Sequence, residues 1–231
     1  MKESPQCSSR ELVWLARGLA FTLAGLVGAV ACVALSRLSP VAAQLDRHLL
    51  GLPPAGALLW IGAACLHRVT TPGGVWCAAT KRCLWLAVCV FFFSPFAYLS
   101  FREPSVDYLV FNFLFFSVAS AVFVCCTNRM VLRLAEFHDD RLMTLWARGN
   151  ECFTYAALLV AAGAFAAASW IVATEEGMEV EGAVELFWSG FWPWLLKLCL
   201  APVCVTAALL WSMKAVTMAR FEALARAGEK V

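Results

Sequence analysis

The chain has 231 residues, of which 62% are hydrophobic and 15% are charged, and its mean hydropathy is +0.76. A soluble domain carries about 25% charged and about 45–50% apolar residues, so this composition excludes an ordinary soluble globular protein. The net charge of +2 gives no electrostatic support for nucleic-acid binding. We therefore expect an all-α, polytopic integral membrane protein, a single membrane domain over residues 1–231 with the lipid bilayer as its first partner.

Six apolar runs approach or exceed the length needed to cross about 30 Å of hydrocarbon. They cover residues 18–36, 49–66, 83–101, 108–126, 152–174 and 186–213. The sequence therefore predicts a six-helix transmembrane bundle. The first run is longer than the apolar core of a signal peptide, so we expect a retained helix, although residues 41–43 resemble a cleavage site. Ala24 and Gly28 in this run form a small-residue pair that would allow close helix packing.

The second run, 49–66, is the weakest predicted span because Pro53, Pro54 and three glycines interrupt it. It either crosses the membrane or enters it as a re-entrant segment. A re-entrant segment would leave five crossings and move the amino terminus to the outer side. Residues 67–82 are then expected to form a loop before the third run.

Residues 128–150 follow the fourth run with no proline in between, and apolar residues recur at helical spacing opposite Arg129 and Arg133. These apolar positions are Met130, Val131, Leu134, Phe137, Leu142 and Leu145. We expect one amphipathic helix that continues the fourth span into the cytoplasm. A second, weaker amphipathic helix is expected over 214–227, and both helices could dock a partner protein or each other.

The distribution of basic residues predicts an orientation. Thirteen of the 18 Lys and Arg residues lie in the four segments predicted to share one side with both termini. Arg37, Arg47 and Arg102 lie in the opposite loops, and Arg17 and Lys197 lie in or beside spans. Because basic residues accumulate in cytoplasmic segments, both termini are predicted to be cytoplasmic and the acidic loop 175–185 to lie outside. We expect a bacterial inner membrane because no organelle signal is present.

Lys197 is the basic residue well inside an apolar run, and it lies between Pro193 and Pro202. Charges within the membrane often bind substrates or ions, and two prolines could break the sixth helix, as in many transporters. The structural alternative is that Lys197 snorkels towards the aromatic residues at the outer interface. Asn112, an amide in the fourth span, is expected to bond to a neighbouring helix, with a pore-lining role as the alternative.

Glu136, His138 and Asp140 belong to the densest group of potential metal ligands or acid–base residues. On one helix, adjacent side chains point about 100° apart, so this group could not converge on one ion without a partner helix. Glu136 and Asp140 would share a face at i, i+4. The sequence has no Cys-x-x-Cys pair, zinc-site spacing or phosphate-binding motif, so we predict no metal and no cofactor and expect free thiols.

These patterns favour a non-catalytic multi-pass membrane protein, either a subunit of a membrane complex or a partner-docking protein. The first alternative is a small transporter or permease that uses Lys197 and Asn112. The second is a membrane enzyme that acts on a lipid-linked substrate, for which the sequence offers no nucleophile–base pair. The fifth run is rich in Ala and Gly, so it is expected at the bundle centre or at a contact in a homo- or hetero-oligomer.

Overall fold

The computed structural model describes residues 7–38, 50–102, 106–174 and 192–228. These residues form six α-helices and no strand, which confirms the predicted all-α class for this part of the chain. The helices are α1 Ser9–Leu38, α3 Leu52–His67, α4 Gly74–Arg102, α5 Asp107–Phe137, α6 Arg141–Thr174 and α8 Trp192–Gly228. The predicted acidic loop 175–185 and the beginning of the sixth run, 186–191, lie outside the described residues.

Four of these helices are long and apolar enough to cross a membrane, which supports an integral membrane protein. The candidate spans are Ser9–Leu35, Gly74–Ser100, Phe111–Phe137 and Leu200–Ala223. Helix α3 has only 16 residues, about 24 Å, which is short of a full crossing. Pro53 and Pro54 lie in its first turn, where a missing N–H costs nothing, so they begin the helix instead of interrupting it. The exact number of crossings stays a prediction.

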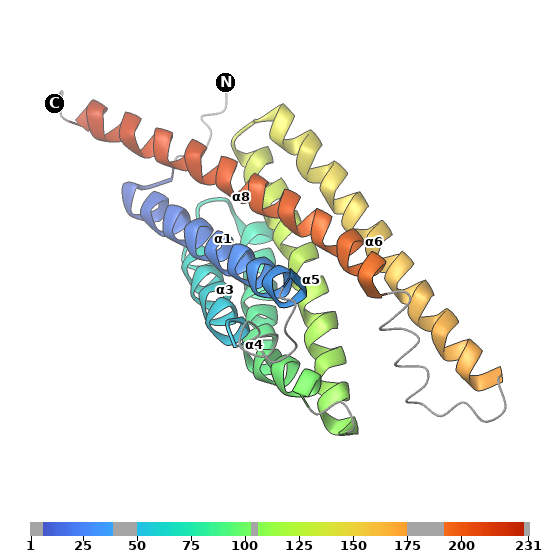
Figure 1. Cartoon of the computed structure of the whole chain (residues 1–231). Coiled ribbons are helices and arrows are strands. Elements are labelled where there is room, and N and C mark those ends of the chain that lie inside the picture. Colours follow the sequence, from blue (N-terminus) through green and yellow to red (C-terminus); the bar gives the residue numbers. More distant parts are fainter. Residues whose placement is uncertain (1–6, 39–49, 103–105, 175–191, 229–231) are drawn as a thin grey trace.

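The helices pack in an order that leaves α6 at the edge of the bundle. Helix α3 packs against α1 and α4, α5 packs against α4, and α8 contacts α1, α5 and α6 (Figure 1). A side chain added at Gly163 in α6 would meet no atom within 4 Å. The Ala- and Gly-rich fifth run is therefore not at the bundle centre, contrary to one of its two predicted roles. Its role in a subunit contact stays a prediction.

Helices α1 and α3 pack with their backbones in close contact. A Cβ atom on Gly62 would lie 2.6 Å from the backbone nitrogen of Thr22 and 3.0 Å from the carbonyl oxygen of Gly18. Only glycine fits at such a distance, because any side chain would push the two helices apart. Of the predicted pair, Gly28 lies at this contact, since a Cβ atom on it would be 3.6 Å from Cβ of Ala55 in α3, whereas Ala24 is exposed.

The amino terminus of α1 is tied to the turn between α3 and α4. Ser8 and Glu11 form a capping box, in which the backbone N–H of Glu11 donates to Ser8 Oγ (3.3 Å) and that of Ser8 donates to Glu11 Oε2 (3.2 Å). Glu11 Oε1 also accepts hydrogen bonds of 3.1 Å from the backbone N–H groups of Thr70 and Thr71. The predicted loop 67–82 is therefore only a short turn, since α4 already begins at Gly74.

Helix α8 runs from Trp192 to Gly228 and passes through Pro202 without a break. The break of the sixth helix that the transporter alternative would use is not observed at Pro202, and the prediction of a separate helix over 214–227 is wrong, because these residues continue α8. Membrane helices tolerate an internal proline because side chains of neighbouring residues and helices satisfy the freed backbone groups.

The four segments predicted to face one side of the membrane lie at one end of the bundle. Glu11 joins the start of α1 to the α3–α4 turn, and Nη2 of Arg220 in α8 donates to the carbonyl oxygen of His138 between α5 and α6 (3.3 Å). Figure 1 shows the start of α1, the end of α8 and the α5–α6 turn at this same end. The grouping agrees with the charge pattern, and the cytoplasmic location of this end stays a prediction.

Candidate functional site

A sharp turn, which we call the elbow (His138–Asp140), joins α5 to α6. The N–H of Asp140 donates to the carbonyl of Ala135 and the N–H of Asp139 to that of Glu136, both at 3.1 Å. These two bonds form a Schellman motif, which ends a helix when the first of the two donor residues is left-handed. That residue is Asp139, which has φ +54°. Aspartate tolerates this conformation better than most non-glycine residues. The elbow thus reverses the chain within three residues.

Asp140 also begins the next helix. Its Oδ1 accepts a hydrogen bond of 3.0 Å from the backbone N–H of Met143, which is an N-cap interaction. The prediction of one amphipathic helix over 128–150 is therefore wrong, and Glu136 and Asp140 do not share a helical face. The sequence did hold a signal for this turn, because Asp is among the preferred N-cap residues.

The elbow changes which apolar residues are covered. Met130, Val131 and Leu134 in α5 are buried as predicted, whereas Leu142 and Leu145 in α6 are 65% and 70% exposed. Trp146 beside them is 59% exposed. Leu142, Leu145 and Trp146, which we call the apolar ridge, are spaced i, i+3, i+4 on one face of the first two turns of α6.

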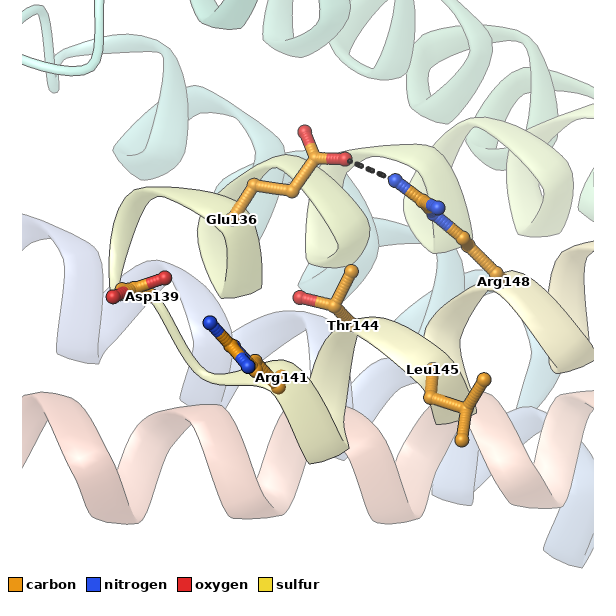
Figure 2. Close-up of a pocket in the computed structure, with 6 residues that line it drawn as sticks. All are labelled: Glu136, Asp139, Arg141, Thr144, Leu145 and Arg148. Atoms are coloured by element: carbon orange, nitrogen blue, oxygen red, sulfur yellow. Dashed lines mark hydrogen bonds and ion pairs between the residues drawn. The ribbon is translucent and has the colours of Figure 1, made fainter.

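Next to the ridge, a cleft of about 320 Å³ separates the end of α5 from the start of α6 (Figure 2). It is lined by Glu136, Asp139, Arg141, Thr144, Leu145 and Arg148. Glu136 accepts bonds from two arginines, at 2.8 Å from Arg133 Nη1 and at 3.2 Å from Arg148 Nη2. Arg141 has no acidic partner within 4.0 Å among the described residues. The cleft therefore holds one guanidinium that is free to pair with an incoming carboxylate.

His138 is buried at the elbow, with 8% of its surface exposed, and both ring nitrogens lack a hydrogen-bond partner among the described residues. Burial and the nearby Arg220 lower its pKa to about 4, against a smaller opposing effect of Asp140. The imidazole is therefore neutral near pH 7. In the described part of the chain, no three His, Cys, Asp or Glu side chains come together as a metal site. Glu136, His138 and Asp140 thus have three separate roles: ion pair, buried ring and helix cap.

We expect the stability of the protein to fall as the pH drops from about 6.5 to about 4. The unfolded imidazole has a pKa of about 6.5, whereas the folded one has a pKa of about 4. As the pH falls, the imidazole therefore takes up a proton in the unfolded state before it does so in the folded state. The free energy of unfolding thus decreases between about pH 6.5 and about pH 4. His138→Leu should remove this part of the pH dependence, measured as unfolding midpoints in detergent at about pH 7.5 and about pH 5. An unchanged pH dependence in the variant would assign it to other groups.

A second polar feature, the Asn–Thr cluster (Asn128, Asn150, Thr154 and Thr206), joins α5, α6 and α8. Asn128 Nδ2 donates to Thr154 Oγ1 (3.0 Å), and Asn128 Oδ1 accepts from Asn150 Nδ2 (3.0 Å) and Thr206 Oγ1 (2.6 Å). Asn150 Nδ2 also lies 3.0 Å from Thr206 Oγ1. All four residues are buried. Neither Asn128 nor Asn150 is a site residue predicted from the sequence, although an amide near an apolar run is the signal that the sequence offers for this cluster.

The structure does not bring the other predicted site residues together. Asn112 Nδ2 donates to the carbonyl oxygen of Tyr108, one turn earlier in its own helix, at 2.7 Å. The expected bond to a neighbouring helix is therefore wrong for Asn112, and Asn128 makes such bonds instead. Lys197 belongs to helix α8, and its side chain is outside the described part of the structure.

Comparisons of the chain with known protein families, with curated proteins and with solved structures find no match.

Proposed function

We propose that this chain is a non-catalytic multi-pass membrane protein that docks a helix of a partner protein at its elbow. The apolar ridge carries this proposal, because three large apolar side chains are 59–70% exposed at a helix start that also bears charged residues. Exposed apolar groups with a charged rim are typical of protein interaction sites.

The lengths of the helices support a position of the ridge outside the hydrocarbon. Helix α6 has 34 residues and α8 has 37, which correspond to about 51 Å and about 55 Å. A bilayer core of about 30 Å covers only part of each helix. The predicted fifth span begins at Cys152, so the first eleven residues of α6, 141–151, are left on the elbow side. Lipid tails would therefore not cover the apolar ridge, so a protein partner is the expected cover for its exposed side chains.

The elbow is a rigid support for such contacts. Val131, Leu134, Leu210 and Met213 are fully buried in the core that α5 and α8 share with the other helices. Arg220 adds a hydrogen bond from α8 to the elbow itself. A surface held in this way binds at a lower entropic cost than a mobile segment.

The partner's chemistry follows from the ridge and the cleft. Side chains spaced i, i+3, i+4 match the apolar face of a second helix. Arg141 has no acidic partner among the described residues, whereas Arg148 is paired with Glu136. We therefore infer an amphipathic partner helix with Leu-like side chains and one Asp or Glu that reaches Arg141.

Three observations favour docking over transport. The transporter interpretation used Asn112 and two proline-broken helices, together with Lys197. Asn112 bonds within its own helix, α3 begins at its prolines, and α8 passes through Pro202 unbroken.

We expect a photo-reactive amino acid at Leu145 to crosslink to one protein in native membranes. The crosslinked peptide should have apolar residues at helical spacing and should contain an Asp or Glu. Leu142→Glu and Arg141→Gln should each abolish this adduct. The same probe at Val75, which is 65% exposed in another helix at the same end, is the matched control and should not give it. Adducts to lipid alone, or to many unrelated peptides, would contradict the proposal. Leu134 is unsuitable for this test because it is fully buried.

A further inference from the structure

The two sides of the elbow end of the bundle differ in how their basic residues are paired. On α5, α6 and α8, four of the seven basic residues at this end form an ion pair with a glutamate (Arg129, Arg133, Arg148 and Arg226), whereas Arg141, Lys214 and Arg220 have no acidic partner within 4.0 Å among the described residues. At the same end of α1, α3 and α4, five basic residues have no acidic partner within 4.0 Å among the described residues. They are Arg10, Arg17, Arg68, Lys81 and Arg82.

Glu11 is the single acidic residue in the described parts of α1, α3 and α4. Its carboxylate is already occupied by hydrogen bonds from Ser8, Thr70 and Thr71. The α1–α3–α4 side of this end thus has an excess of positive charge that the described part of the chain does not neutralise. Such an excess attracts a negatively charged surface or ligand.

Two of these arginines converge on one tryptophan. Cζ of Arg68, directly after α3, lies 4.5 Å from the ring centroid of Trp14, and Cζ of Arg17 in α1 lies 5.9 Å from it. Contact with a ring face leaves the N–H edge of a guanidinium available, and this edge matches the oxygens of a phosphate group. Trp14 therefore orients both arginines without using their hydrogen-bond donors.

The α1–α3 contact fixes the relative position of the backbone segments that carry the two arginines. A Cβ atom on Gly18, the residue after Arg17, would lie 2.6 Å from Cγ of Leu66, two residues before Arg68. The two helices therefore cannot slide or separate here without loss of packing. Both guanidinium groups therefore lie against the same ring on a rigid helix pair.

The position of this pair along the helices points to lipid. Residues 18–35 after Arg17 and residues 52–66 before Arg68 contain no charged residue. Both arginines thus lie at the end of an uncharged apolar segment, which in a bilayer would put them at the depth of the headgroups, where tryptophan is also enriched. A basic site between helices at this depth fits an anionic headgroup.

We propose that Arg17 and Arg68, held by Trp14, form a binding site for the phosphate headgroup of an anionic phospholipid. The site is on α1 and α3, so it does not depend on the elbow docking a partner. One lipid at this position would neutralise part of the excess charge and connect α1 to α3.

Native mass spectrometry of the detergent-solubilised protein, titrated with phosphatidylglycerol or phosphatidylcholine, tests the site. The wild type should retain phosphatidylglycerol preferentially, and Arg17→Gln with Arg68→Gln should weaken its binding about 30-fold, as expected for two basic residues. Lys81→Gln with Arg82→Gln removes the same charge at the same end and should change binding by no more than about threefold. If both double variants weakened phosphatidylglycerol binding equally, the lipid would be held by the overall positive charge of this end, and the proposed site would be overturned.

Two further measurements keep the test decisive. Added inorganic phosphate should not displace phosphatidylglycerol, because the acyl chains contribute to binding, and full displacement would indicate a site for a soluble anion and overturn the lipid assignment. Arg17→Lys with Arg68→Lys keeps the charge but loses the planar N–H edges, so it should bind with intermediate affinity. Wild-type affinity in this variant would contradict headgroup recognition by the guanidinium pair. This variant also serves if the glutamine variant does not fold.

Discussion

Gly62→Ala should destabilise the protein by about 2–3 kcal/mol, although alanine is the better helix former. The added Cβ would lie 2.6 Å from the backbone nitrogen of Thr22 and 3.0 Å from the carbonyl oxygen of Gly18. Both are backbone atoms of α1, which cannot rotate away as a side chain could. The two helices would have to separate along their whole contact. The measurement is the free energy of unfolding in mixed detergent micelles with increasing dodecyl sulfate.

Gly163→Ala is the matched control for this prediction. Gly163 is also inside a helix, but a Cβ atom there would meet nothing within 4 Å. Both variants gain the same helix propensity, so their difference isolates the steric effect at the α1–α3 contact. We expect Gly163→Ala to be neutral or to stabilise by up to about 1 kcal/mol. Equal stability of the two variants would show that α1 and α3 are not packed this closely.

The presence of the helices was predictable, because hydropathy and length are local properties of the sequence. Helix ends were harder to predict. At the elbow, the left-handed residue is Asp139, where glycine would have been the stronger signal. Pro53 and Pro54 were interpreted as interruptions of a span that begins before them. The structure instead begins α3 at Leu52, so the same residues mark its start.

The candidate site was less predictable, because it depends on which helices become neighbours. Asn128 and Thr206 are 78 positions apart, and their bond exists because α5 packs against α8. Sequence spacing could not give this pairing, and it also could not show that Asn112 would bond within its own helix. The ridge was missed for a related reason. Leu142 and Leu145 belong to the predicted apolar face of residues 128–150, and only the elbow turns them outwards.

Asn128→Leu should lower the free energy of unfolding by about 2 kcal/mol, from three interhelical hydrogen bonds of about 0.6 kcal/mol each. Leucine keeps a similar volume but removes one donor and an oxygen that accepts two bonds. Thr154, Asn150 and Thr206 would each lose a partner. Because these three residues lie on α6 and α8, the loss should appear as a weaker association of both helices with α5. Hydrogen exchange in α6 and α8 should increase with it.

Asn112→Leu separates this effect from the general cost of replacing an amide in a membrane helix. It is the same substitution in the same helix at another buried position, but among the described residues Asn112 bonds only to the carbonyl oxygen of Tyr108. Asn112→Leu should lower the free energy of unfolding by no more than about 0.5 kcal/mol, because the hydrogen bond that it removes is local to one helical turn. A cycle that combines Asn128→Leu with Thr206→Val should show coupling, since the two side chains share a bond. Equal losses for Asn112→Leu and Asn128→Leu, with no coupling, would mean that the cluster does not hold α5, α6 and α8 together.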